Sequence, residues 1–400
     1  MKLSARAHSI EPFHALAIGQ VAADMESAGQ RVIKLSIGEP DFGAPAAVRE
    51  AMRTVMDGRP LPYTPALGIS ELREAIANFY LTRHGVDVDP ARIAITSGAS
   101  AALLLALAAT TDVGDEVLMA DPSYPCNREM VNAFGGVVRL APTSPATRYQ
   151  LSVQALLDTW TDATNAVMIA SPSNPTGTTI EPTELAAICQ IARERNVWRI
   201  VDEIYLDLAD DAVDGSKAQT VLTHDPDAIV ISSFSKYFGM TGWRLGWAVV
   251  PEELVEVIER MSMHYFLCAS TPVQFAALAA FSAEALAECE SRKVELLERR
   301  TLVLAALEGT SLRVHVVPDG AFYIYIDVSA TGLDAWTFCE RALTEAHVAL
   351  TPGRDFATET ADTHVRLSYA ASREDLTEAC RRLAEFVATL PETSANDVHP

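Results

Sequence analysis

Short apolar runs alternate with amphipathic stretches from about residue 93 onward, and this alternation constrains the fold more than any other feature of the sequence. The runs that we expect to form buried strands are residues 93–96, 117–120, 166–170, 199–201 and 229–232. Helices are expected at residues 100–109 and 184–195, the second with Pro182 near its start. Strands that alternate with helices build a largely parallel, doubly wound sheet, so the sequence predicts an α/β fold.

The sequence changes in character after a long helical tract expected at residues 273–307. Beyond it, strands expected at residues 312–317, 321–328 and 365–368 and helices at 335–346 and 373–390 predict a smaller α+β domain. A short strand expected at residues 33–37 belongs to an N-terminal segment that packs with this domain.

A chain of 400 residues exceeds what one hydrophobic core usually organises. We therefore expect four parts in this chain. They are an N-terminal segment (1–45), a large domain (46–285), a small domain (286–390) and a polar tail (391–400).

Composition disfavours several classes of partner. The 53 acidic and 31 basic residues give a formal charge of −22, which opposes binding to nucleic acid or to an anionic membrane. We find no signal peptide and no apolar run of about 18 residues that would span a membrane. The six cysteines include no close pair, which suits a reducing compartment, and we expect a cytoplasmic protein.

The histidines predict no metal site. None of the nine has a ligand spacing such as H-x-x-x-H. We therefore interpret isolated histidines such as His264 and His315 as packing residues.

Small or polar segments follow the first three strands, at the edge where open α/β sheets bind ligands. Ser97-Gly98-Ala99-Ser100 can bind a phosphate on backbone N–H groups, although simple helix capping is the commoner reason for such a segment. Tyr124 stands between two prolines, where it could stack on a flat ring or pack in the core. Asn174 stands in a turn held by two prolines, and a plain turn is the alternative.

The last two strands lead into charged residues. Asp202-Glu203-Ile204-Tyr205 places an acid directly after a buried strand, where Asp202 needs a cationic or hydrogen-bonding partner. The fifth strand leads into a segment that holds two serines, Lys236 and Arg244 around a glycine. Lys236 taken alone could equally be a surface lysine.

Together the five segments resemble those of the class I/II, fold type I, pyridoxal-phosphate-dependent aminotransferases, in the same order and over essentially the whole chain. The specificity comes from the set, because each motif alone is common. The resemblance implies a large domain with a mostly parallel seven-stranded sheet between helices and a smaller α+β domain. It also implies pyridoxal 5′-phosphate as the cofactor.

The resemblance assigns roles around this cofactor. Lys236 would hold it as a Schiff base and would then move the proton between the substrate α-carbon and the cofactor, while Asp202 would pair with the ring nitrogen. Asn174 and Tyr205 would hydrogen-bond the ring hydroxyl oxygen, and Tyr124 would stack on the ring face. The phosphate would be bound by Gly98, Ala99, Ser100, Ser233, Ser235 and Arg244.

The resemblance also assigns residues to the substrate and to a second subunit. Arg366, near the end of an expected strand, matches the arginine that binds the substrate α-carboxylate. The Gly38 backbone and Asn174 would contact the substrate as well. Tyr63 matches the position that reaches the phosphate of the neighbouring subunit, which implies a homodimer with shared active sites.

The substrate is less constrained. Some aspartate-preferring relatives carry a lysine in the phosphate turn that binds the distal carboxylate, whereas this sequence has Ser100 followed by small apolar residues. We therefore expect a neutral or hydrophobic L-amino acid as donor and 2-oxoglutarate or pyruvate as acceptor. Phe322 and Tyr323 are expected to line the substrate pocket.

Two alternatives stay open. The same motifs can serve a pyridoxal-phosphate-dependent β-eliminating C–S lyase, because a fold does not fix a reaction. An aminotransferase-like transcriptional regulator is disfavoured by the acidic charge. The motifs do not determine the amino acid, the 2-oxo acid or the pathway.

Overall fold

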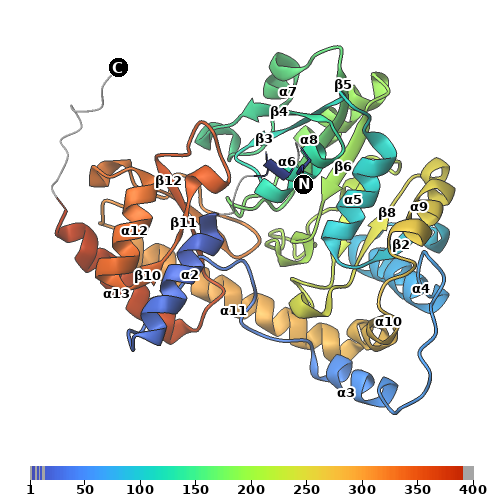
Figure 1. The fold of residues 1–400 in the computed structure, drawn as a ribbon, viewed down its shortest axis with the longest axis horizontal. Helices are drawn as coiled ribbons and strands as arrows, with labels where there is room; N and C mark the ends of the chain where they lie inside the picture. The colour runs from blue at the N-terminus through green and yellow to red at the C-terminus, as the bar shows by residue number, and fades with distance from the viewer. Residues whose placement is uncertain (1, 5–6, 9, 11–13, 391–400) are drawn as a thin grey trace.

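The computed structural model describes residues 2–4, 7–8, 10 and 14–390, and the tail expected at 391–400 lies outside them. Figure 1 shows a larger body built on a central sheet and a smaller body that gathers the N-terminal helix α2 with the C-terminal helices α12 and α13. The long helix α11 runs along the bottom of the view from one body to the other. No helix among the described residues is long and apolar enough to span a membrane.

Helices and strands alternate along most of the described chain. The helices are α2 (His14–Ser27), α3 (Ala46–Val55), α4 (Ser70–Phe79), α5 (Ala99–Thr110), α6 (Pro125–Ala133), α7 (Val153–Thr159), α8 (Pro182–Glu194), α9 (Glu252–Tyr265), α10 (Thr271–Ala277), α11 (Ala283–Leu307), α12 (Ala335–Ala346) and α13 (Arg373–Ala388). The strands are β1 (Ile33–Lys34), β2 (Ile93–Thr96), β3 (Glu116–Asp121), β4 (Val137–Pro142), β5 (Thr164–Ala170), β6 (Trp198–Asp202), β7 (Ile229–Ser233), β8 (Gly246–Val249), β9 (Tyr323–Asp327), β10 (Val348–Ala349), β11 (Thr351–Pro352) and β12 (His364–Ser368).

The larger body is built on a seven-stranded sheet in the order β2-β8-β7-β6-β5-β3-β4. Strand β8 is antiparallel to both of its neighbours, and the other neighbouring strands pair in parallel. Because β2 and β7 both oppose β8, they point the same way, and all strands except β8 end at one edge. The mostly parallel seven-stranded sheet expected from the sequence is confirmed.

The central strands are buried on both faces, which explains their continuous apolar runs. Ile200 and Ile231 pack in a core cluster to which α5 and α9 contribute. Their neighbours Val201 and Val230 point the other way, into the cluster that includes residues of α8. Polar side chains that bind a ligand are therefore expected where these strands end.

The smaller body contains a three-stranded antiparallel sheet in the order β11-β12-β9. Strands β12 and β9 pair from His364 opposite Asp327 to Ser368 opposite Tyr323. Strand β1 pairs in parallel with β10, with Ile33 opposite Val348. The N-terminal strand thus pairs with a strand of the smaller body.

Several local expectations differ from the structure. The helical tract expected at residues 273–307 is broken between α10 and α11, where the Ser282 side chain accepts the Ala285 N–H at 3.2 Å and starts a new helix. The strand expected at residues 312–317 is wrong, because this segment makes only one isolated bridge, between Arg313 and Asp327. It forms instead a loop that carries His315.

Strands β4 and β8 are not predicted from the sequence. Strand β4 lies at the edge of the sheet with Val137 exposed and carries the charged Arg139, so it lacks a continuous apolar run. Strand β8 is short and begins at Gly246. The strands of the large sheet all fall within residues 46–285, and the domain boundaries themselves stay a prediction.

Candidate active site

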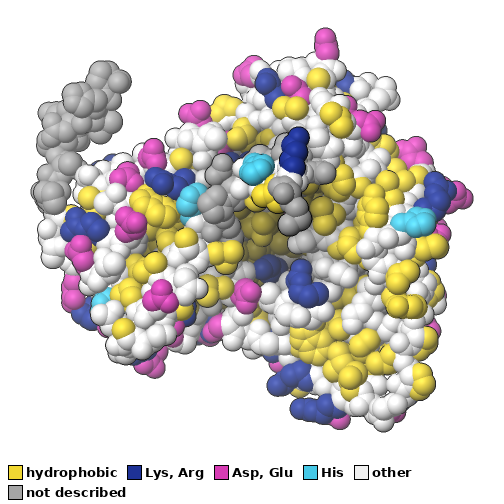
Figure 2. All heavy atoms as spheres, viewed as in Figure 1, with side chains coloured by type: hydrophobic (Ala, Val, Ile, Leu, Met, Phe, Trp, Pro, Cys, Tyr) yellow, Lys and Arg dark blue, Asp and Glu magenta, His cyan; other side chains and the backbone are white. Residues whose placement is uncertain are grey.

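A cavity of about 310 Å³ lies at the carboxyl edge of the large sheet and is also lined by residues of the smaller body. Figure 2 shows a hollow between the two bodies on this face. The lining from the large sheet comes from residues at or just after strand ends, such as Asp202 and Lys236, whereas Arg366 comes from β12. Parallel strands bring their ends together at this edge, which is where such sheets bind ligands.

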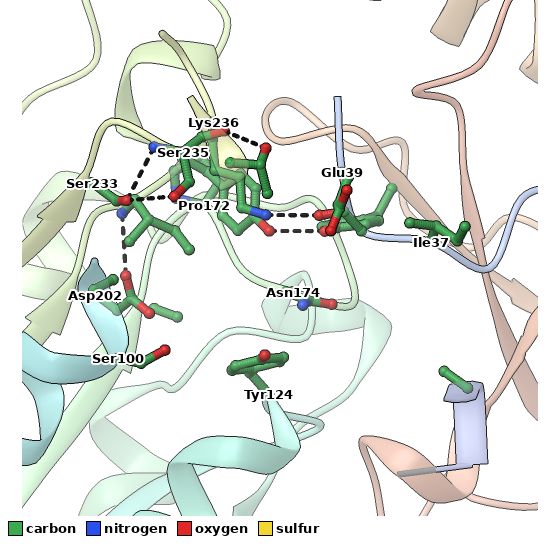
Figure 3. A pocket seen from close by; sticks show the side chains of 18 of the residues that line it. Ile37, Glu39, Ser100, Tyr124, Pro172, Asn174, Asp202, Ser233, Ser235 and Lys236 are labelled. Carbon is green, nitrogen blue, oxygen red and sulfur yellow. Dashed lines mark hydrogen bonds between the residues drawn. The ribbon is translucent and has the colours of Figure 1, made fainter. Parts of the chain in front are cut away.

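Most of the residues predicted for the site meet in this cavity, and Figure 3 shows several of them facing one another. Those that line it are Gly38, Ala99, Ser100, Tyr124, Asn174, Asp202, Tyr205, Ser233, Ser235, Lys236, Arg244 and Arg366. Gly98 lies directly behind this lining, against Arg244. Tyr63 does not line the cavity of its own chain. Its side chain is exposed on the surface instead.

Lys236 follows strand β7 and points its amine into the cavity. The Nζ atom donates a hydrogen bond to the Gly38 carbonyl oxygen at 2.7 Å, and within the described chain no carboxylate forms an ion pair with it. Burial lowers the pKa of this amine to about 8, with Glu39 acting in the opposite direction. Near neutral pH, a larger fraction of an amine with a lowered pKa is unprotonated and can act as a nucleophile or accept a proton.

Asp202 ends strand β6 and is only 6% exposed. The backbone N–H of Ile204 donates to its carboxylate at 3.1 Å, and no Lys or Arg of the described chain pairs with it. Burial raises the pKa of this acid to about 6, against the weaker effect of the Ile204 hydrogen bond and of Lys236. Such a carboxylate suits a ligand that brings a cationic N–H.

One end of the cavity is built to hold an anion. The N-terminus of α5 presents the Ala99 and Ser100 backbone there, after Gly98 with a φ of 83°. A Cβ at Gly98 would lie 2.6 Å from Arg244 Nη2, so only glycine lets the guanidinium approach this turn. Arg244 forms no ion pair with a described carboxylate, and Ser235 Oγ lies 3.5 Å from its Nη1. A helix N-terminus with a free guanidinium and serine hydroxyls fits a phosphate.

Arg366 lies at the other end of the cavity and is almost fully buried. Nη1 donates to Asn174 Oδ1 at 2.8 Å and Nη2 donates to the Ser36 carbonyl oxygen at 2.6 Å. The guanidinium lies 4.5 Å from the centre of the Tyr323 ring and 4.8 Å from that of Phe356. Its Nε is buried without a partner, and no described carboxylate pairs with the group. This cation is held in place for an anionic ligand.

Two tyrosines connect the bodies beside Lys236. The hydroxyl groups of Tyr205 and Tyr323 lie 2.8 Å apart, and the Lys236 amine lies 5.7 Å from the centre of the Tyr205 ring. A Cβ at Gly38 would lie 2.6 Å from the Tyr323 hydroxyl oxygen, so a glycine is required where this segment crosses the cavity. Phe322, also expected in the lining, is buried behind it with its ring edge-on to Tyr205.

Residues 30–383 match the family described as aminotransferase class I and II. The chain belongs to this family. It is 38% identical to a valine–pyruvate aminotransferase of Mycobacterium tuberculosis, over 94% of this chain and 97% of that protein. It is 34% identical to an aspartate/prephenate aminotransferase of Thermus thermophilus, over 96% of this chain and 98% of that protein.

Solved structures agree with the family. An aminotransferase from Mycobacterium tuberculosis superimposes with a TM-score of 0.92 at 38% identity, covering 97% of this chain and 100% of that one. The Thermus thermophilus aspartate aminotransferase with maleate superimposes with a TM-score of 0.90 at 34% identity. The match covers 96% of this chain and 99% of that one. This aminotransferase therefore transfers an amino group from an amino acid to a 2-oxo acid and depends on pyridoxal phosphate.

The cavity of the aminotransferase fits this cofactor on its own chemistry. Asp202 is a buried acid without a cationic partner, which suits a protonated ring nitrogen. The anion end beside Arg244 suits the phosphate, and the Lys236 amine in the same cavity suits the aldehyde carbon.

Sequence reasoning missed several lining residues. Those that no motif indicated include Ala15, Leu16, Ser36, Ile37, Glu39 and Thr241. Glu39 follows Gly38, and Thr241 lies between Lys236 and Arg244, so both could have been predicted from segments already assigned to the site. Ala15 and Leu16 carry no signal, because the packing of α2 against the smaller body decides which of its side chains reach the cavity.

The interpretation of two histidines was wrong. His264 is exposed on α9 rather than packed. His315 is also exposed, with 37% of its side chain accessible, and its Nε2 pairs with Asp327. Neither contributes to a core cluster.

We expect Asp202→Asn to stabilise the protein prepared without pyridoxal phosphate at pH 8. The pKa of Asp202 is about 6 in the folded chain, against about 3.9 for an unfolded aspartate, so between these values the folded state binds more protons and loses stability as the pH rises. Two pKa units correspond to about 3 kcal/mol, which is the upper limit of the gain in the free energy of unfolding. Urea denaturation measures it.

The same comparison at pH 4 is the control, because the folded state then carries a protonated Asp202 and little difference from Asn is expected. A loss of stability of equal size at both pH values would contradict the assignment of an unpaired buried carboxylate.

Proposed function

We propose that this aminotransferase takes its amino group from a neutral or hydrophobic L-amino acid and passes it to 2-oxoglutarate or pyruvate. The supporting observation is the set of cations around the cavity. Within the described chain only Lys236, Arg244 and Arg366 line it as Lys or Arg, and each has a function at the cofactor or at the α-carboxylate. Among the described residues that line the cavity there is no further Lys or Arg for a second substrate carboxylate.

The relatives act on different substrates, so sequence identity to them does not by itself indicate which amino acid is the donor. The relative at 38% identity is named for valine and pyruvate, and the one at 34% for aspartate and prephenate. The cation count favours the first pair, and between the two proposed acceptors it favours pyruvate, because 2-oxoglutarate carries a second carboxylate.

Lys236 is the residue that we assign to proton transfer. Bound pyridoxal phosphate supplies a ring that withdraws electrons from the substrate α-carbon. When the cofactor is bound, Lys236 Nζ would move the proton between this carbon and the cofactor carbon that is bonded to the substrate nitrogen. Its pKa of about 8 supports this role, because a base with a pKa near the working pH accepts and returns protons efficiently.

The residues around the ring hold and polarise it. Asp202 would keep the ring nitrogen protonated by forming an ion pair with it. Within the described chain no Lys or Arg pairs with this carboxylate, so the ring nitrogen would be its cationic partner. The Asn174 amide oxygen accepts from Arg366, which leaves its NH2 group to donate to the ring hydroxyl oxygen together with the Tyr205 hydroxyl. Tyr124, which lines the cavity, would lie against the ring face.

Arg366 binds the substrate α-carboxylate. Its Nη atoms are fixed by Asn174 and by the Ser36 carbonyl oxygen, so the guanidinium is oriented before the substrate arrives. The unpartnered Nε and the flanking rings of Tyr323 and Phe356 leave a planar, desolvated cation for this carboxylate. The clamp fixes the α-carbon near Lys236.

Arg366→Lys should raise the KM for the amino acid about 10- to 100-fold, since a hydrogen bond to a charged group contributes about 1.5–3 kcal/mol. A lysine keeps the charge but cannot hold Asn174, Ser36 and a carboxylate in one plane. Steady-state kinetics measure the change, and a cofactor titration should give an unchanged affinity. An equal loss of cofactor affinity would show that Arg366 supports the whole cavity instead.

A homodimer with shared active sites is part of the proposal. The exposed Tyr63, 78% accessible, stands in a loop that α10 holds through Thr271 Oγ1 to the Pro62 carbonyl oxygen at 2.8 Å and Gln274 Nε2 to Thr64 Oγ1 at 2.9 Å. Figure 2 shows hydrophobic side chains gathered over α3 and α10. An aromatic ring held rigidly in solvent suits a partner surface.

Analytical ultracentrifugation should therefore give a dimer mass. Tyr63→Phe should weaken the affinity for pyridoxal phosphate about tenfold, because it removes one hydrogen bond to a charged phosphate. A monomer that binds the cofactor with wild-type affinity would exclude the shared site.

The absence of disulfides among the six cysteines, all of which lie in the described chain, supports a reducing location such as the cytoplasm.

The donor is tested with a panel of common L-amino acids against 2-oxoglutarate and pyruvate. Neutral and hydrophobic amino acids should give a higher kcat/KM than aspartate or glutamate as donor. Without acceptor, a single half-reaction should convert the bound cofactor from its aldehyde form to its amine form and release one equivalent of 2-oxo acid per active site. Lys236→Ala should lower this rate about 10²- to 10⁴-fold or more, and Lys34→Ala, a lysine of β1 outside the cavity, is the matched control.

Other products would favour the alternatives. Pyruvate and ammonia from a cysteine-like substrate would indicate a β-eliminating lyase. Salt-dependent binding to a DNA operator would indicate a regulator.

A further inference from the structure

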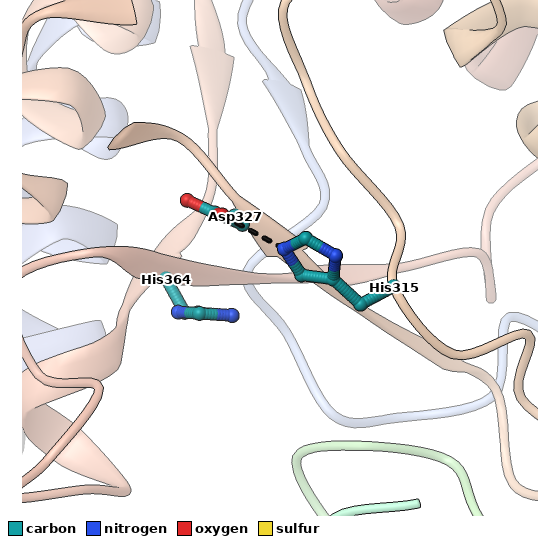
Figure 4. Close-up of side chains that lie close together, drawn as sticks. All are labelled: His315, Asp327 and His364. Carbon is teal, nitrogen blue, oxygen red and sulfur yellow. Dashed lines mark hydrogen bonds and ion pairs between the residues drawn. The ribbon is translucent and has the colours of Figure 1, made fainter. Parts of the chain in front are cut away.

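Three side chains of the smaller body bring metal-binding atoms together away from the cavity. They belong to His315, Asp327 and His364, and one ligand atom of each lies within 4.8 Å of the other two. His315 Nε2 lies 2.8 Å from Asp327 Oδ2. His364 is directly opposite Asp327 in the pairing of β12 with β9. Figure 4 shows His315 reaching Asp327 from its loop, with His364 beside them.

The Asp327 carboxylate is only 12% exposed, and among the described residues no Lys or Arg pairs with it. The Ser329 N–H donates to Oδ1 at 2.8 Å, which directs Oδ2 toward the two histidines. An almost buried carboxylate between two imidazoles leaves one negative charge without a full cationic partner. Two imidazole nitrogens and one carboxylate oxygen are a donor set that binds divalent transition ions.

His364 is oriented by groups outside the cluster. Its ring stacks on Tyr325 with a centroid distance of 4.7 Å, and its Nδ1 lies 2.8 Å from Thr363 Oγ1. A second hydrogen-bonding partner of this kind fixes the ring of metal-binding histidines. Nε2 now contacts the Tyr149 hydroxyl at 3.1 Å, and an ion would replace this contact.

We propose that His315, Asp327 and His364 bind one divalent transition-metal ion, for which Zn²⁺ is the probe. Tetrahedral zinc with bonds of about 2.1 Å separates its ligand atoms by about 3.4 Å. The 2.8 Å contact between His315 Nε2 and Asp327 Oδ2 must therefore widen, while the three ligand atoms, now within 4.8 Å of one another, close around the ion. His315 can supply the movement, because it stands on a loop and is exposed. Its open side leaves room for water as a further ligand.

The ion would connect the loop of residues 312–317 to both strands of the β9–β12 pair. This pair also carries Tyr323 and Arg366, which line the substrate cavity. The site would therefore stabilise the strands that hold the α-carboxylate arginine, without touching the cofactor or the reacting atoms.

The experiment uses the enzyme loaded with pyridoxal phosphate and freed of metal with a chelator. Titration calorimetry with ZnCl2 should show one site per chain, and zinc should raise the Tm by roughly 2–5 °C at saturation. His315→Ala should weaken binding at least about tenfold, because even the loss of an outer partner of a metal ligand costs about 10- to 100-fold. Asp327→Asn should do the same.

His264→Ala, which removes another exposed histidine on α9, is the matched control and should leave zinc binding unchanged. Circular dichroism checks that each variant is folded, and the exposed position of His315 makes its variant the decisive one. No zinc bound by the wild type at micromolar concentration would overturn the proposal. Equal affinity in His315→Ala would also overturn it, by assigning the ion to other groups such as the free cysteines.

Discussion

Burial of the large sheet on both faces is the constraint on which the rest of the structure depends. The strands β5, β6 and β7 are mostly apolar on both sides, so a charged group on either face has a high desolvation cost unless it is paired, as Arg199 of β6 is with Asp225. Polar residues are therefore concentrated where the strands end. Because all strands except β8 end at one edge, side chains from segments far apart in the sequence converge in a single cavity.

The cavity holds an acid and an amine that do not neutralise each other. Asp202 and Lys236 both line it, yet no ion pair forms between them. Burial shifts the two pKa values toward each other, to about 6 and about 8, which disfavours the charged form of each group. The protein gives up folding stability at this point, and the cofactor can recover it by supplying a cationic nitrogen to one group and an aldehyde to the other.

The smaller body contributes a cation, Arg366, whose orientation is fixed before a ligand binds. Arg366 is fixed by hydrogen bonds to Asn174 of the larger body and to Ser36 of the N-terminal segment, so one side chain connects three parts of the chain. The same strand places His364 two positions earlier, beside Asp327. Substrate binding and the proposed ion site thus share one strand pair, and the rigidity of that pair matters to both.

The sequence by itself determined the apolar periodicity, and with it the sheet, most of its helices and the polar segments after the strands. Asp202, Asn174, Lys236 and Arg244 could be predicted because a motif directly after a buried strand must lie at the ligand-binding edge. Strand β4 could not, since its edge position removes the continuous apolar run. Strand β8 does have a short apolar run, residues 247–249, but its antiparallel place between β2 and β7 is fixed only by the tertiary structure.

Only the tertiary structure decided which distant residues meet. The lining by Ala15 and Leu16 depends on how α2 packs, and the meeting of His315, Asp327 and His364 depends on the register of β9 with β12 and on a loop that was expected to be a strand. Local periodicity reports whether a side chain is buried, but the partner that it meets is fixed by packing between elements far apart in the chain.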